Sequence, residues 1–119
     1  MNILVNEFLY CNKGVFFRNY FITICSEGDQ NFIYYYDFAN HFKNKMGAQE
    51  HIIGKVHQFQ LHISKEYLII SSFSSSSRRY VRLVIYELFP TERTFVKNRT
   101  PTVGETIQIK YVTSQSINC

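Results

Sequence analysis

Apolar and polar residues alternate along much of this chain, and such alternation is typical of strands that bury one face. Apolar residues dominate positions 3–10 and 15–25, and the turn-forming residues 12–14 separate the two runs. We therefore expect a first strand over 3–10 and a long second strand over 15–25. A further turn at 26–29 leads into a third strand through the aromatic run 32–36.

The period changes after the third strand. Phe38, Phe42 and Met46 recur at every fourth position, which is the spacing of one helix face. Asp37 is a suitable N-cap for such a helix, and Gly47 is a suitable stop. The pattern predicts one amphipathic helix from Asp37 to Met46, with its apolar face in the core.

Strand-like patterns return after the predicted helix. The segments 56–63, 66–73 and 78–89 predict three strands, and a serine-rich loop precedes the third. Pro90 is expected to end that strand because proline has no N–H to donate to a ladder. A loop follows, and Gly104 begins a last strand.

This order predicts a mainly β fold, with α+β as an alternative class. Three strands and a helix before further strands is the order of an OB-type barrel of about seven strands. A strongly twisted antiparallel sheet with one inserted helix fits the same order. We expect a single domain over residues 1–113 and a flexible tail over 114–119.

Composition and charge narrow the function classes. Aromatic residues make up 17% of the 119 residues, with 11 Phe and 9 Tyr, so several rings are expected at the surface. The net charge of +4 is compatible with an anionic partner. Neither a phosphate-binding glycine motif nor a GxSxG nucleophile motif is present, so we expect a non-enzymatic protein.

The cysteine and histidine positions predict no cofactor and no metal. Cys11, Cys25 and Cys119 are odd in number and lack CxxC spacing, which argues against a disulfide framework, and Cys25 is expected to be buried and inert. No stretch approaches the roughly 20 apolar residues of a membrane span. The N-terminus has no signal-peptide pattern, so a cytoplasmic location is expected, in an infected host cell if the protein is viral.

The segment RRYVRLVIY at 78–86 carries the most informative pattern. Alternate strand residues share a face, so Arg78, Tyr80, Arg82 and Tyr86 are expected to point together toward solvent. Guanidinium groups neutralise phosphates and aromatic rings stack on bases, so this face predicts binding of single-stranded DNA or RNA. The alternative is that the two tyrosines pack across strands and the arginines are merely solvated.

Five further residues extend the binding hypotheses. Arg18, Tyr20 and Lys110 would support the nucleic-acid face if their strands are its neighbours. Tyr34 and Tyr36 share one face of the third strand and are candidates for a protein interface. The second hypothesis is therefore a protein–protein interaction factor, such as a viral or phage accessory or inhibitor protein, which also forms a homodimer through this cluster or an edge strand.

A third hypothesis, ranked below these two, is a metal-independent ribonuclease. His62, Glu66 and Arg82 would form its acid–base set. Almost any chain of this length supplies such a set, and each histidine is more simply explained as a hydrogen-bonded surface residue.

Overall fold

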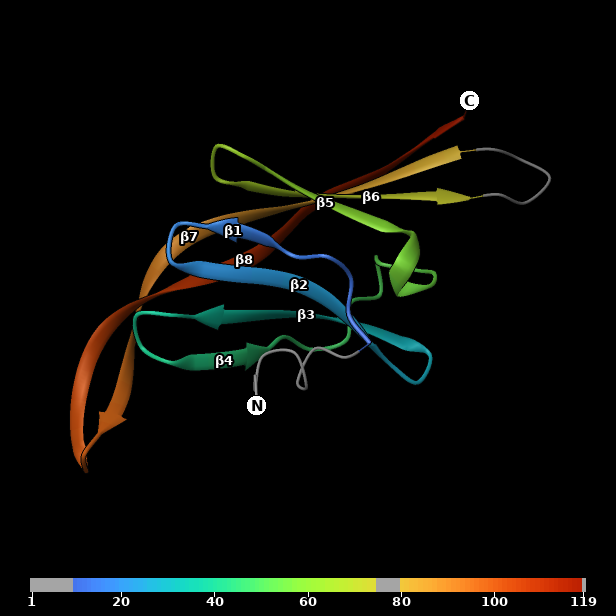
Figure 1. Ribbon diagram of the computed structural model, residues 1–119. Coiled ribbons are helices and arrows are strands. Elements are labelled where there is room, and N and C mark those ends of the chain that lie inside the picture. The colour runs from blue at the N-terminus through green and yellow to red at the C-terminus, as the bar shows by residue number, and fades with distance from the viewer. Residues whose placement is uncertain (1–9, 75–79, 119) are drawn as a thin grey trace.

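The computed structural model describes residues 10–74 and 80–118 and shows two four-stranded antiparallel sheets (Figure 1). The first sheet has the order β1-β2-β3-β4 and the second the order β5-β6-β7-β8. The elements are β1 (Val15–Phe17), β2 (Tyr20–Glu27), β3 (Gln30–Asp37), β4 (Phe42–Lys45), the 3₁₀ turn η1 (Val56–Gln58), β5 (Phe59–Ser64), β6 (Tyr67–Ser74), β7 (Tyr80–Lys97) and β8 (Thr100–Asn118). In Figure 1, β7 and β8 pass behind the first sheet, and the far end of their hairpin extends beyond it.

The core lies between the two sheets because alternate residues of each strand point inward. Ile22, Ile24 and Ile33 of the first sheet are completely buried. Leu68 and Leu88 of the second sheet are equally inaccessible to solvent. The predicted mainly β class is therefore confirmed, whereas the OB-type barrel is not formed, because the strands are divided between two separate sheets.

The segment before β1 connects the two sheets at one side. Cys11 and Cys25 lie opposite each other in an antiparallel bridge and form a disulfide. The side-chain amide of Asn12 donates to the carbonyls of Val56 at 2.6 Å and Phe59 at 2.5 Å, at the start of the second sheet. The expectation of no disulfide was wrong. An odd number of cysteines does not reveal that the chain path beside β2 brings Cys11 next to Cys25.

The predicted helix from Asp37 to Met46 is absent, and β3, a turn and β4 occupy those residues. The Asp37 carboxylate accepts the backbone N–H groups of Ala39 and Asn40, as an N-cap does, but the turn is not continued. The three apolar residues spaced by four reach different neighbours. Phe38 is exposed beside Tyr36, Phe42 packs edge-on against Phe95, and Met46 contacts the core.

The expected second strand over 15–25 is divided in two. Arg18 has a left-handed φ of 54°, and the turn at Arg18 and Asn19 joins β1 to β2 as a hairpin. The break reverses the chain direction, so one expected strand becomes two neighbours. Most of the expected first strand over 3–10 lies outside the described residues.

Pro90 does not end β7, which continues to Lys97. Pro90 lies opposite Ile107, and the Ile107 carbonyl accepts a hydrogen bond from the Tyr35 hydroxyl of the first sheet at 3.2 Å. Because this carbonyl is directed away from β7, the missing proline N–H costs no ladder bond. β8 also continues through 114–118, where the flexible tail was expected, and pairs there with the start of β7.

We predict that loss of the disulfide lowers stability without changing the fold. Closing a loop between cysteines 14 positions apart restricts the unfolded chain, and the stabilisation for such a loop is about 3 kcal/mol. Urea unfolding of the Cys11→Ser variant should show a loss of that order, whereas the Cys119→Ser variant, which keeps the pair, should unfold like the wild type. Equal stability of all three proteins would contradict the prediction.

Candidate interaction surfaces

Tyr86, predicted to stack on bases, is completely buried in the core. Its hydroxyl donates to the side-chain oxygen of Gln49 at 3.0 Å, and burial raises the pKa of this phenol. Val84 and Leu88 on the same side of β7 are buried as well. The predicted orientation of this strand was therefore wrong, because a phenol with a hydrogen-bond partner is well suited to burial.

The other members of the predicted nucleic-acid face do not form an exposed row. Arg82 lies on the inner side of β7, opposite Ser72 and Ser116, and is half-buried. Tyr80 is placed by its backbone at the first position of β7, and Arg78 lies outside the described residues.

The predicted supporting residues lie on separate surfaces. Arg18 is exposed in the β1–β2 turn and forms an ion pair with Glu105 at 3.9 Å. Tyr20 is buried, and burial, together with nearby carboxylates, raises its pKa to about 12. Lys110 is exposed on the outer side of β8, directly opposite Glu87 of β7. The structure therefore does not assemble Arg18, Tyr20 and Lys110 into one site.

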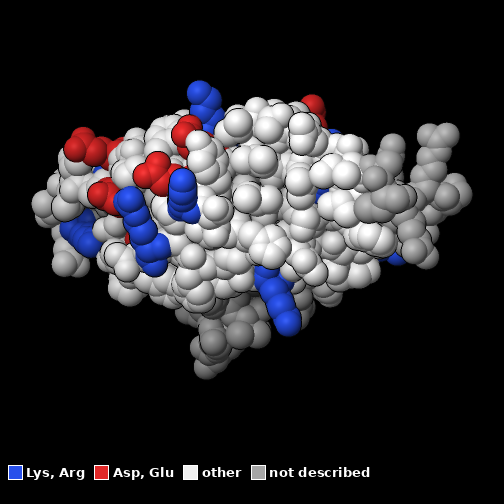
Figure 2. All heavy atoms as spheres, turned by 90° about the horizontal axis from the view of Figure 1, so that it is seen from above, with Lys and Arg blue, Asp and Glu red and all other residues white. Residues whose placement is uncertain are grey.

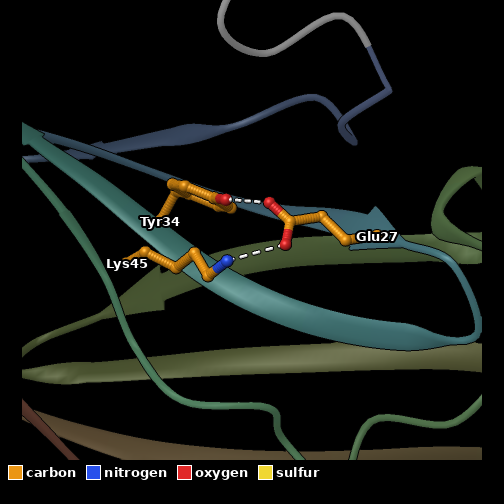
Figure 3. A network of polar contacts seen from close by, with 3 residues as sticks. All are labelled: Glu27, Tyr34 and Lys45. Carbon is orange, nitrogen blue, oxygen red and sulfur yellow. Dashed lines mark hydrogen bonds and ion pairs between the residues drawn. The ribbon is translucent and has the colours of Figure 1, made fainter.

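Tyr34 and Tyr36 do share the outer side of β3, but Tyr34 is largely buried and Tyr36 half-buried. The Tyr34 hydroxyl donates to one Glu27 oxygen at 2.5 Å, and the Lys45 ammonium contacts the other at 2.6 Å (Figure 3). These hydrogen bonds, from Lys45 first and then from Tyr34, lower the pKa of Glu27. Burial and the bond to Glu27 raise the pKa of Tyr34 to about 12. The network links β2, β3 and β4.

Phe16, Phe21, Tyr36 and Phe38 form an aromatic patch on the outer side of the first sheet. The Phe16 ring lies 6.1 Å from that of Phe38 in a stacked arrangement and 5.1 Å from that of Phe21. Phe16 and Phe38 remain 65% and 41% exposed. Sequence reasoning missed this patch because Phe38 was placed on the core face of a helix and the strand break at Arg18 was not foreseen.

A second patch covers the outer side of β6, β7 and the end of β8, and we call it the uncharged face. Phe73 and Ile117 are about half exposed, at 52% and 49%, and Val81 lies between them in register. Two further rows continue the patch, and neither contains an Asp, Glu, Lys or Arg. Its outward residues are Ile69, Ser71, Phe73, Val81, Leu83, Ile85, Thr113, Gln115 and Ile117.

Among the described residues of this sheet, the next row carries charge, because Glu87 and Lys110 lie opposite each other there. Figure 2 shows the molecule from above the view of Figure 1, which is the side nearest to β5 and β6. Charged side chains gather toward one end there, and a broad middle region carries few. Exposed apolar side chains that gather on one face, as Phe73 and Ile117 do here, mark candidate interaction sites.

A groove of about 600 Å³ lies between the segment before β1 and strand β5. Lys13, His57 and His62 are among its lining residues, and none of these lining residues is a carboxylate. His62 points to the outer side of the second sheet, whereas Arg82 lies on its inner side, so the proposed ribonuclease set does not converge. Within residues 10–74 and 80–118, no three His, Cys, Asp or Glu side chains are arranged to hold a metal.

No protein-family model, curated protein or solved structure matches this chain. Across the part of the chain that the structure describes, no helix is long and apolar enough to cross a membrane. The two patches therefore have to be interpreted from their own chemistry.

We predict that the Lys45→Met variant raises the pKa of Glu27 toward the ordinary carboxyl value. The folded-state pKa is depressed, so the contribution of this network to stability is present above the unfolded pKa and is lost as the pH falls through the folded one. An NMR titration of the Glu27 side-chain carboxyl carbon measures the change. The Lys65→Met variant, altered in the exposed β5–β6 turn, is the control, and an unchanged Glu27 pKa in Lys45→Met would refute the assignment.

Proposed function

We propose that this chain is a non-enzymatic protein-interaction domain that uses the uncharged face of the second sheet to bind a protein partner. One observation carries the proposal. Three consecutive rows of outward side chains on β6, β7 and β8 combine exposed apolar residues with small polar ones and contain no formal charge. The cores of protein–protein interfaces are depleted of charged residues in the same way.

The composition of this face supports a protein partner over a nucleic acid. Binding to a nucleic acid depends largely on cations that neutralise phosphates. Among the described residues, the cation nearest in register is Lys110, which lies at the margin of the face and opposite the carboxylate of Glu87. Burial of apolar side chains such as Phe73 and Ile117 is favourable in proportion to the area removed from water. An apolar protein surface provides that gain, whereas a phosphate backbone does not.

The rigidity of the face also supports this function. Beside Ile69 and Ile85, the outward residues alternate with Ile70 and Val84, which are buried in the core. A face held by a packed sheet loses little conformational freedom on binding, which lowers the free-energy cost of association.

A second candidate function, binding of a single-stranded nucleic acid, is supported by the aromatic patch. Phe16 and Phe38 present stacked, exposed rings, as base-stacking surfaces do. Lys43 and Lys45 lie on the neighbouring strand β4, where the Lys45 ammonium is 4.3 Å from the centre of the Phe32 ring. This candidate ranks second because the Glu27 carboxylate contacts Lys45 and would repel a phosphate.

We predict that the Phe73→Lys variant abolishes partner binding. A lysine at this position would have to be desolvated beneath an apolar partner, so a loss of affinity of at least about tenfold is expected. The measurement is quantitative affinity capture after nuclease treatment, followed by titration with the purified captured protein. The control is Val96→Lys, which adds the same charge at an exposed position of β7 away from the face. A partner that binds both variants equally would exclude this face.

For the second candidate, we predict that the Phe38→Ala variant weakens binding of a labelled single strand. Loss of the stacking contact with one base should reduce the binding free energy by about 1–3 kcal/mol. The affinity of the wild type should also fall steeply as the salt concentration is raised. Fluorescence anisotropy at low salt measures both effects, and Phe73→Ala, on the opposite sheet, should bind like the wild type. Absence of binding by the wild type at low salt would eliminate the candidate.

A further inference from the structure

We propose that the C-terminal half of β8, residues 112–117, pairs with the same segment of a second copy of this chain in an antiparallel arrangement about a twofold axis. The two second sheets would then join into one continuous eight-stranded sheet. This inference goes beyond the proposed function, because it concerns the edge of the sheet rather than its face and does not depend on an external partner.

The middle of β8 contacts the first sheet and its β3–β4 turn. The Glu105 carbonyl accepts the side-chain amide of Asn40, and the Ile107 carbonyl accepts the Tyr35 hydroxyl, both at 3.2 Å. These carbonyls point away from β7, as those of alternate residues on an edge strand do. Two backbone carbonyls on this part of the edge therefore have partners within the chain.

The edge changes character after Tyr111. The His51 ring stacks on the Tyr111 ring at 3.7 Å, and the extra residue Val112 then forms a bulge between Tyr111 and Thr113. From Val112 to Ile117, no backbone hydrogen bond from the described residues reaches the side of β8 that faces away from β7. Alternate N–H and C=O groups along this half are thus available for a further strand.

The sequence of this half lacks the usual protection of an exposed edge. Natural edge strands are commonly protected by charged side chains, especially lysine, or by proline. Residues 112–118 read VTSQSIN and contain neither. Val112, Thr113 and Ile117 are β-branched and favour strand pairing. The two exposed apolar side chains, Val112 and Ile117, would be partly covered by a neighbouring strand.

A second copy fits this edge better than an unrelated charged partner. Two copies each carry a net charge of +4, and pairing through residues 112–117, which contain no formal charge, adds no like-charge contact to their mutual repulsion. Twofold pairing places each residue opposite a symmetry-related one, so a single neutral segment satisfies both sides of the contact. The uncharged face, which includes Thr113, Gln115 and Ile117, would then run across both copies.

The test is the mass of the full chain in solution, measured by sedimentation velocity over a wide concentration range. All proteins carry Cys119→Ser, so that no intermolecular disulfide through this residue contributes. The parent protein is expected to sediment as a monomer–dimer equilibrium. The Gln115→Lys variant places like charges near the twofold axis and should weaken dimerisation by about tenfold or more. Far-UV circular dichroism and urea unfolding verify that each variant is folded.

Two matched variants make the outcome decisive. Gln60→Lys introduces the same change at an exposed position on β5, the opposite edge strand of the same sheet, and should leave the dimer intact. Phe73→Lys alters the uncharged face and should also leave the dimer intact. Failure of the proposed function and failure of this inference can therefore be distinguished. A monomer at every concentration, a dimer that Gln115→Lys leaves intact, or a dimer that Phe73→Lys dissociates would overturn the edge-pairing arrangement.

Discussion

Burial of Tyr86 between the two sheets is the constraint on which the other features of the surface depend. Its ring packs edge-on against Tyr111, and its hydroxyl is satisfied by Gln49, so the phenol is buried without an unpaired polar group. Because side chains alternate along a strand, this one placement turns Val84 inward and Leu83 outward. The inner and outer sides of β7, and of the strands paired with it, follow from that choice.

The two sheets differ in what they present to solvent as a result. The outer side of the second sheet is apolar and uncharged around Leu83, while the outer side of the first carries rings and lysines around Phe38. The first sheet also provides Tyr35, whose hydroxyl covers part of the β8 edge. The same packing that forms the core thus leaves one face and one half of an edge open to a partner.

Strand periodicity was the part of the fold that could be read reliably. The strand expected over 56–63 is present from Phe59 onward as β5, although 56–58 form the 3₁₀ turn η1. The shared face of Tyr34 and Tyr36 is also present, because period-two patterns depend only on local geometry. The prediction of a helix from Asp37 to Met46 was wrong, because apolar residues spaced by four can also lie in a turn and in the strands that the turn joins. The disulfide was missed because the pairing of Cys11 with Cys25 depends on the path of the chain beside β2.

The amino-acid sequence by itself determined that the chain is rich in strands, positively charged and aromatic, since these properties follow from residue types and local alternation. Only the tertiary structure decided which side of each strand is buried. Residues 79–86 carry bulky side chains on both sides, so alternation alone cannot say whether Leu83 or Tyr86 faces the core. The opposing sheet and the segment after β4 make that choice, because the sheet gives Tyr86 an apolar enclosure and Gln49 of that segment gives it a hydrogen-bond acceptor.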